Sequence, residues 1–301
     1  MKLTFHKVNK YFGEKHVLKD ISFTVKSGQI FGYLGRNGAG KTTSLRILMD
    51  VFAASDGTIT MDDKPFKPGD YKIGYLPEER GMYSKTLVKD QLLYFAMLRG
   101  ATRQHAQESI EYWSKKFGVD IYLNSKLETL SKGNQQKVQI TQAFLNEPDI
   151  LILDEPFSGL DPVNSQVFQD ALTEYISDDR IIIFSSHQMS YVETFCDDIA
   201  IINFGQIILK GSLEAIKQER GMNKVKLALN TPNDAFEQLL NTKGVTVEHD
   251  HKTMILTLPE AMTHQELLEF TIKEGMAITL FSDYTPSLHD IFVDVAGGTN
   301  A

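Results

Sequence analysis

The fold of this chain is decided by the segment Ile30-Phe31-Gly32-Tyr33-Leu34-Gly35-Arg36-Asn37-Gly38-Ala39-Gly40-Lys41-Thr42. It begins as an apolar run typical of a strand buried on both faces. It continues into the pattern G-x-x-x-x-G-K-[ST], and a helix is expected to start near Lys41. Glycines let a backbone wrap phosphate oxygens with its N–H groups, and a helix N-terminus adds partial positive charge. The segment therefore predicts a phosphate-binding loop; a plain glycine-rich turn is the alternative.

Two elements of the sequence supply groups for phosphate chemistry. In the loop, Lys41 is placed to reach the β and γ phosphates of a nucleotide, and the Thr42 hydroxyl to ligate magnesium. The run Ile150-Leu151-Ile152-Leu153-Asp154-Glu155 delivers two carboxylates from the C-terminal end of an apolar strand, where α/β sheets bind ligands. We expect Asp154 to hold magnesium and Glu155 to polarise a water for attack on the γ phosphate. Helix caps and turns are the alternative use of such acids.

Further short apolar runs lack the alternation of a half-exposed sheet. They cover 30–34, 73–76, 150–153, 181–184 and 199–202. Helical spacing occurs between them, as at Leu45, Leu48, Met49 and Phe52, so the sequence predicts an α/β core. The stretch from about 86 to 145 is mainly helical, and we expect it to form a subdomain inserted into that core.

The C-terminal part differs in the order of its predicted elements and in its charge. From 222 to 301 the pattern predicts strand, helix, strand, strand, helix, strand and a final short helix, an order that suits a ferredoxin-like α+β domain. This part holds five Lys and no Arg against eleven Asp and Glu, a charge of -6 out of -8 for the whole chain. We therefore expect a cassette over 1–220 and a separate acidic domain over 222–301.

Composition limits the possible functions. The chain has 301 residues, with 31 Lys and Arg against 39 Asp and Glu. This acidic balance argues against binding nucleic-acid phosphates, so no nucleic-acid partner is expected. The single cysteine, Cys196, excludes an intrachain disulfide and is expected to be an inert buried thiol. The start of the chain is not signal-like and no run approaches about 18 apolar residues, so we expect a soluble protein that reaches a membrane only through a partner.

Three further motifs accompany the loop and the acidic strand. They are Leu130-Ser131-Lys132-Gly133-Asn134-Gln135-Gln136 at the start of an amphipathic helix, Ser158-Gly159-Leu160-Asp161-Pro162, and Ser185-Ser186-His187 at the end of an apolar run. With this ordered set, the sequence resembles the ATP-binding subunit of an ABC transporter over about residues 3 to 215. The resemblance implies a P-loop NTPase cassette that uses ATP and Mg²⁺.

The resemblance also implies a role for each matching residue. In that family the Leu-Ser-x-Gly segment binds the γ phosphate of the ATP held by the other subunit of a dimer. His187 matches a histidine that contacts the γ phosphate, Asp161 a loop at the dimer interface, and Tyr11 the aromatic that stacks on adenine; ordinary packing is the alternative for His187 and Tyr11. The expected nucleotide-binding residues are Tyr11, Asn37, Gly38, Ala39, Gly40, Lys41, Thr42, Thr43, Glu78, Ser131, Gly133, Asn134 and Asp161. The expected catalytic residues are Glu155, His187 and Lys41, and the expected metal ligands are Thr42, Asp154 and Glu78.

Two segments depart from the family pattern. Lys132 and Asn134 stand where the family usually has glycine and glutamine, and we expect the Lys132 side chain to point to solvent. In Ile73-Gly74-Tyr75-Leu76-Pro77-Glu78-Glu79-Arg80, the family has glutamine at the position of Glu78. That glutamine bridges the metal or attacking water and the helical subdomain. The charge of Glu78 favours a closer metal or an ion pair with Arg80.

Partners follow from the same resemblance. In the family, the region of Met82, Tyr83, Leu87 and Phe95 forms a groove for a short helix of the membrane subunit; ordinary subdomain core is the alternative. The ending 284–292 and the small acidic domain resemble the extension of bacterial export-type, sodium-efflux-like ABC ATPases. This extension is expected to serve dimerisation or regulation, with a stabilising appendage as the alternative. We interpret His249 and His251 as turn residues rather than metal ligands.

The sequence therefore predicts an ATPase that powers transport, with export as the expected direction. ATP closes a homodimer, and separate transmembrane permease subunits receive the motion at the inner face of the cell membrane. The alternative is a soluble ABC-type nucleotide-binding regulator that is not coupled to a membrane transporter.

Overall fold

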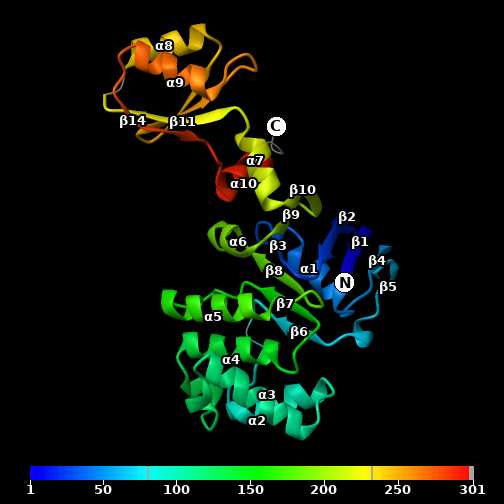
Figure 1. Cartoon of the computed structure of the whole chain (residues 1–301). Coiled ribbons are helices and arrows are strands. Elements are labelled where there is room, and N and C mark those ends of the chain that lie inside the picture. The colour runs from blue at the N-terminus through cyan, green and yellow to red at the C-terminus, as the bar shows by residue number, and fades with distance from the viewer. Residues whose placement is uncertain (80, 232, 298–301) are drawn as a thin grey trace. The chain divides into compact units, whose positions relative to one another are not determined.

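The computed structural model describes residues 1–79, 81–231 and 233–297 (Figure 1). The chain divides into two compact units, chiefly Met1–Leu213 and Glu214–Asp294. Two sheets occur in the described part of the first unit and one in that of the second.

A six-stranded sheet forms the centre of the first unit, in the order β10-β9-β3-β8-β7-β6 within the described residues. Its strands are β3 (Ile30–Leu34), β6 (Ile73–Leu76), β7 (Ile150–Asp154), β8 (Ile181–Ser186), β9 (Asp198–Asn203) and β10 (Gln206–Ser212). Neighbouring strands run parallel except β9 and β10. All residues of β3, β7 and β8 are buried, which confirms the prediction of strands covered on both faces.

Helices alternate with these strands, as predicted for an α/β core. α1 (Lys41–Leu48) follows β3, α5 (Pro162–Tyr175) follows β7 and α6 (Met189–Phe195) follows β8. α7 (Leu213–Gly221) comes after β10 in the chain and lies almost wholly in the second unit. The helical insert lies between β6 and β7 and contains α2 (Val88–Leu98), α3 (Arg103–Lys116) and α4 (Lys132–Phe144). Short 3-10 turns lie at Pro68–Asp70, Asp120–Tyr122 and Leu127–Thr129. Cys196, which ends α6, is buried, and burial raises the pKa of its thiol.

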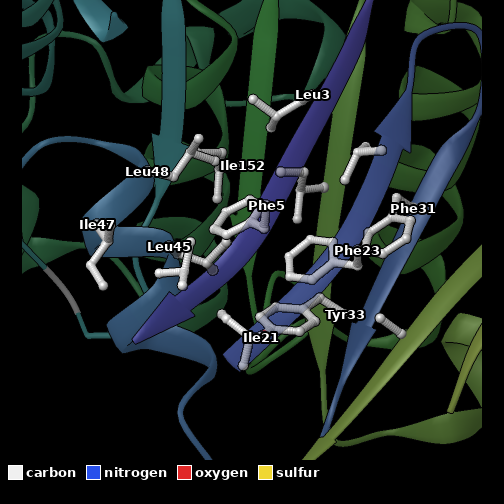
Figure 2. Close-up of a cluster of buried hydrophobic side chains, with 14 of the residues drawn as sticks. Leu3, Phe5, Ile21, Phe23, Phe31, Tyr33, Leu45, Ile47, Leu48 and Ile152 are labelled. Atoms are coloured by element: carbon white, nitrogen blue, oxygen red, sulfur yellow. The ribbon is translucent and has the colours of Figure 1, made fainter. Parts of the chain in front are cut away.

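A second sheet of the first unit is absent from the sequence-based expectations. It is antiparallel, in the order β2-β1-β4-β5, with β1 (Lys2–Phe12), β2 (Lys15–Lys26), β4 (Asp56–Met61) and β5 (Lys64–Pro65). In β2 buried side chains alternate with less buried ones from Ile21 to Val25, whereas in β1 the buried residues Leu3, Thr4 and Phe5 are consecutive. Figure 2 shows Phe5 and Phe23 from this sheet beside Tyr33 of β3 and Leu45 of α1. The core thus packs directly against the strand and helix that flank the phosphate loop.

The second unit has the strand and helix order that the sequence predicts. It contains β11 (Lys224–Leu229), α8 (Asp234–Thr242), β12 (Thr246–Asp250), β13 (Thr253–Thr257), α9 (His264–Lys273) and β14 (Ile278–Asp283), followed by α10 (Leu288–Gly297). Its antiparallel sheet has the order β12-β13-β11-β14, which is the ferredoxin-like arrangement. The buried core joins Val225 and Leu256 of the sheet to Phe236 of α8 and Leu267 of α9.

The two histidines near the β12–β13 turn differ in position. His251 lies in the turn with a φ of 52°, as predicted, whereas His249 lies within β12 opposite Met254. The reason is that the hairpin turn is short, so β12 continues to Asp250. His249 Nε2 lies 3.1 Å from Glu237 Oε2. The described residues hold no cluster of three or more His, Cys, Asp or Glu side chains suited to a metal ion.

Candidate functional site

The phosphate loop connects β3 to α1 and borders a pocket of about 210 Å³. Its described lining residues are Arg36, Asn37, Gly38, Gly40, Lys41, Thr42, Thr43 and Glu78. Ala39 does not line the pocket, because it is buried and its carbonyl accepts a hydrogen bond from Gly205 N–H. The loop therefore turns its backbone and polar side chains toward the pocket while Ala39 fastens it to the β9–β10 turn.

Two glycines give the loop this path. Gly40 has a φ of 119°, and a Cβ placed there would lie 2.6 Å from Leu18 Cδ2. Gly35 passes so close to β9 that a Cβ would lie 2.4 Å from the Ile202 carbonyl oxygen. A side chain at either position would push the loop off the core, so the backbone N–H groups could not surround a phosphate.

Lys41 is 7% exposed and points back into the loop that precedes it. Its Nζ donates to the Gly35 carbonyl at 2.6 Å. Burial lowers the pKa of Lys41, and the carboxylates of Glu155, Asp154 and Glu78 oppose that shift. The loop thus contains a largely buried cation within the field of three acids, a placement suited to an anionic ligand.

Asp154 ends β7 and meets the start of α1. Thr42 Oγ1 donates to Asp154 Oδ2 at 3.2 Å. Burial raises the pKa of Asp154, and the hydrogen bond from Thr42 partly opposes this shift. Asp154 Oδ1 is buried and has no hydrogen-bond partner in the described part of the chain. Because a carboxylate with a spare oxygen and a hydroxyl are hard oxygen ligands, these two residues fit a magnesium ion.

Glu155 occupies the next position with a φ of 53° and is 5% exposed. Its Oε1 accepts from His187 N–H at 2.7 Å and lies 2.7 Å from His187 Nδ1. Its Oε2 accepts from Ser186 Oγ at 3.0 Å. Parallel pairing of β7 with β8 brings these groups together, since Asp154 pairs with Ser185. A buried carboxylate held in this way can accept a proton from a water molecule.

Glu78 lies after β6 and is exposed, yet it lines the same pocket as Lys41 and Thr42. Its charge opposes the lowering of the Lys41 pKa by burial and adds to the raising of the Asp154 pKa by burial. Arg80, the expected ion-pair partner of Glu78, lies outside the described residues. The position of Glu78 puts its carboxylate within the electrostatic reach of the predicted metal site.

The expected interface residues lie at two helix starts. Ser131 caps α4 and accepts from Asn134 N–H at 3.3 Å, and both Ser131 and Lys132 are exposed. Asp161 caps α5, and hydrogen bonds from Asn164 hold the pKa of its carboxyl below the ordinary value. A Cβ at Gly133 would lie 3.3 Å from the Gly159 carbonyl, so the two helix starts approach each other.

Tyr11 lies at the end of β1, half exposed, and stacks on His16 with ring centroids 3.9 Å apart. The adjacent Phe12 is equally exposed and contacts Phe52 edge to face at 5.4 Å. Neither aromatic is among the described residues that line the loop pocket.

The structure thus brings together the groups predicted from the loop, the acidic strand and the histidine motif. It leaves Tyr11, Ser131, Gly133, Asn134 and Asp161 outside the described lining of the loop pocket. Two further residues belong to the site: Arg36 lines the pocket, and Ser186 contacts Glu155. The loop motif does not specify the residue at Arg36, and in the sequence Ser186 indicates only the end of a strand.

A phosphate loop, an acidic strand end and a histidine on the neighbouring strand define a P-loop nucleotide-binding protein. The ABC transporter family model matches residues 18–158, and the model of the C-terminal domain of DrrA1-3-like ATP-binding proteins matches residues 211–296. The chain belongs to the family of ABC transporter ATP-binding proteins, whose members bind and hydrolyse ATP.

Relatives and solved structures agree with this membership. The ABC transporter ATP-binding protein YhaQ of Bacillus subtilis is 37% identical over 98% of both chains. The Nod factor export ATP-binding protein I of Burkholderia lata is 30% identical over 75% of this chain and 76% of its own. A solved ATP-binding subunit of an ABC transporter has a TM-score of 0.68 and 27% identity, covering 80% of this chain and all of its own.

In the described residues, helices of the length and apolar character needed to cross a membrane are not found.

Proposed function

We propose that this protein hydrolyses ATP as a dimer and thereby drives transport through separate membrane subunits. The observation that carries the proposal is the single constellation at the ends of β3, β7 and β8, where Lys41, Thr42, Asp154, Glu155 and His187 converge. Phosphoryl transfer needs mainly positioning and neutralisation of charge, and these residues supply both.

Each residue of the constellation has a proposed role. Lys41 exchanges its bond to the Gly35 carbonyl for the β and γ phosphate oxygens. Thr42 and Asp154, with Glu78 nearby, hold Mg²⁺, which when bound neutralises charge on the phosphates. Glu155 accepts the proton of the attacking water, and His187, whose side chain is half exposed, turns to the γ phosphate.

A second copy of the chain completes the site in this proposal. The N-terminus of α4 carries exposed donors at Ser131 and its neighbours, and Asp161 begins α5 beside it. Gln136 of α4 also donates to the Pro156 carbonyl at 3.1 Å, so α4 is tied to the segment that follows Glu155. The start of α4 on one subunit would therefore bind the nucleotide of the other subunit. Through Gln136, α4 would also be linked to Glu155 of its own subunit, the proposed water-activating residue. Tyr11 remains the proposed adenine contact.

The helical insert offers a docking groove for the membrane subunit. A pocket of about 290 Å³ is lined by Tyr75, Pro77, Gly81, Met82, Phe95, Leu98, Arg99, Gln139 and Gln142. Leu98, which lines the groove, and Tyr83, which stacks on the lining residue Phe95, are 68% and 58% exposed. Because Pro77 lines this groove and Glu78 lines the phosphate pocket, one short segment joins both. We propose that a cytoplasmic helix of the permease occupies the groove and places the protein at the inner face of the membrane.

Export is the proposed direction of transport. The Burkholderia lata relative is a Nod factor export ATP-binding protein, and the second unit matches the C-terminal domain of DrrA1-3-like proteins. The resemblance of the C-terminal extension to sodium-efflux-like ATPases stays a prediction and assigns no cargo. The transporter names of the relatives favour this function over that of an uncoupled regulator.

The Glu155→Gln variant tests the proposal. Removing the base should lower kcat on the order of 10³-fold while ATP still binds, because the amide keeps the size of the side chain. The variant should accumulate as an ATP-bound dimer with the permease or at high protein concentration, measured by light scattering with Mg-ATP. Asp290→Asn, a surface change in the second unit, serves as the control and should hydrolyse ATP at the wild-type rate. Wild-type turnover in Glu155→Gln, or monomers under all these conditions, would contradict the proposal.

A further inference from the structure

Ser186 ends β8 and is 2% exposed. Its Oγ accepts a hydrogen bond from Gln188 N–H at 3.0 Å and lies 3.0 Å from Glu155 Oε2. A hydroxyl has one proton and two lone pairs. Because an ionised carboxylate can only accept, the hydroxyl of Ser186 donates its proton to Glu155 Oε2 while one of its lone pairs accepts from Gln188 N–H.

The two oxygens of Glu155 are held by groups of different mobility. Oε1 accepts from the backbone N–H of His187 and also contacts Nδ1 of that residue, whose side chain is 50% exposed and has room to leave. Oε2 contacts Ser186, whose short side chain is buried and fixed by Gln188. A histidine ring that turns to the nucleotide removes the Nδ1 contact and leaves Oε1 with the backbone N–H alone, whereas nothing in the proposed cycle displaces the serine from Oε2.

We propose that Ser186 is a positioning residue for ATP hydrolysis. It holds Oε2 of Glu155 throughout the cycle, so that Oε1 exchanges the His187 ring for the attacking water without rotation of the carboxylate. This inference rests on the proposed function, because it requires Glu155 to be the general base. Ser186 does not itself touch nucleotide or water.

The proposal predicts a specific kinetic change in Ser186→Ala. The carboxylate loses its fixed partner at Oε2 and keeps only the backbone N–H of His187 at Oε1, so its orientation is less restricted and the fraction of productive geometries falls. Loss of a hydrogen bond to a charged group should lower kcat roughly ten-fold or more. The KM for ATP should stay within about two-fold of wild type, because Ser186 is not among the described residues that line the phosphate pocket.

The experiment measures kcat and KM for Mg-ATP, together with melting temperature, on the full-length chain. Ser186→Thr keeps the hydroxyl and should recover most of the wild-type kcat. Ser165→Ala is the matched control, because Ser165 is 3% exposed and its Oγ has no partner in the described residues. It removes a buried serine hydroxyl without touching Glu155 and should leave kcat unchanged. If Ser186→Ala does not fold, Ser186→Cys, which has nearly the same shape and only a weak donor, replaces it.

The outcomes separate the inference from the proposed function. A kcat loss in Ser186→Ala with unchanged KM, recovery in Ser186→Thr and a silent Ser165→Ala support the positioning role. A wild-type kcat in Ser186→Ala overturns that role alone, provided that Glu155→Gln abolishes turnover. A rise in KM that accounts for the whole loss also overturns it. If Glu155→Gln hydrolyses ATP like wild type, the proposed function and this inference fail together.

Discussion

The carboxylates of the two units occupy opposite environments. At the end of β7, Asp154 and Glu155 are 1% and 5% exposed, and burial raises the pKa of Asp154. In the second unit, Glu266 and Asp250 lie at the surface. Hydrogen bonds from Thr263 and Lys226, respectively, hold the pKa values of these two carboxyls below their ordinary values.

The difference separates acids that stabilise a fold from acids kept for chemistry. Glu266 closes a capping box at the start of α9, and Asp250 pairs with Lys226 across the open face of the sheet. Asp154 instead keeps an oxygen without a partner among the described residues, which destabilises the chain until a ligand is bound. Substitution of Glu266 or Asp250 should therefore change the free energy of unfolding of the second unit. Substitution of Asp154 should change the rate of ATP hydrolysis.

Asp154→Asn should show the largest effect and the clearest contrast. Loss of the proposed metal-binding charge should lower Mg-dependent kcat roughly 10³-fold, or about 4 kcal/mol. The same change removes a buried charge and should raise the stability of the ligand-free first unit by about 1 kcal/mol. Phosphate release and urea unfolding followed by fluorescence of Trp113, the sole tryptophan, measure the two effects. A less stable and still active variant would break the contrast.

Phe236→Ala should destabilise the second unit by about 3 kcal/mol, because Phe236 is 1% exposed in the core of that unit. Far-UV circular dichroism should show an early urea transition, whereas Trp113, which lies in α3, should report an unchanged one. Leu239→Ala is the control, since Leu239 is 42% exposed on the same helix and should change stability by less than about 0.5 kcal/mol. A matching shift of the Trp113 transition would show that the two units unfold together.

Thr263→Ala removes the cap of α9 and should cost the second unit about 1 kcal/mol. Thr263→Ser keeps the hydroxyl that accepts from Glu266 N–H at 3.2 Å and should be nearly silent. Urea unfolding by circular dichroism measures both. Equal destabilisation by the two variants would assign the effect to the lost methyl group rather than to the cap.

Acidification should act on the two kinds of carboxylate with opposite sign. The pKa values of Asp250 and Glu266 are lowered, so their contribution to stability is present above the ordinary values and is lost as the pH falls through the lowered ones. The pKa of Asp154 is raised, so its destabilising charge disappears earlier as the pH falls from neutrality. As the pH falls from 7 to 4, the urea midpoint of the first unit in the wild-type chain should therefore rise relative to that in Asp154→Asn. Parallel curves would contradict the assigned shift.

The sequence predicts the parallel sheet and its ligand-binding end because apolar runs such as 150–153 are long enough to be buried on both faces. It does not predict the antiparallel sheet at the N-terminus. There the alternation of β1 is broken by register shifts between Phe5 and Val8 and again near Lys10, so no regular period of two residues survives.

The candidate site shows the same division. Lys41, Asp154 and Glu155 follow from local patterns, because a loop or a strand end fixes their direction. Ser186 does not, since a buried serine at a strand end looks the same in sequence as Ser185 beside it, and only the pairing of β7 with β8 selects one of them. The neighbouring aromatics Tyr11 and Phe12 present a similar ambiguity, because the shift between Lys10 and Tyr11 disturbs which face each occupies.

The positive φ of Glu155 bears on how such a chain evolves. A non-glycine residue in this conformation carries a strain of roughly 1 kcal/mol or more, which glycine would relieve. A single substitution to glycine would relieve this strain, but it would also remove the hydrogen bonds to Ser186 and His187 and, in the proposed mechanism, the general base. Relief of backbone strain alone would favour loss of this acid during evolution. In the proposed mechanism, selection for ATP hydrolysis keeps it.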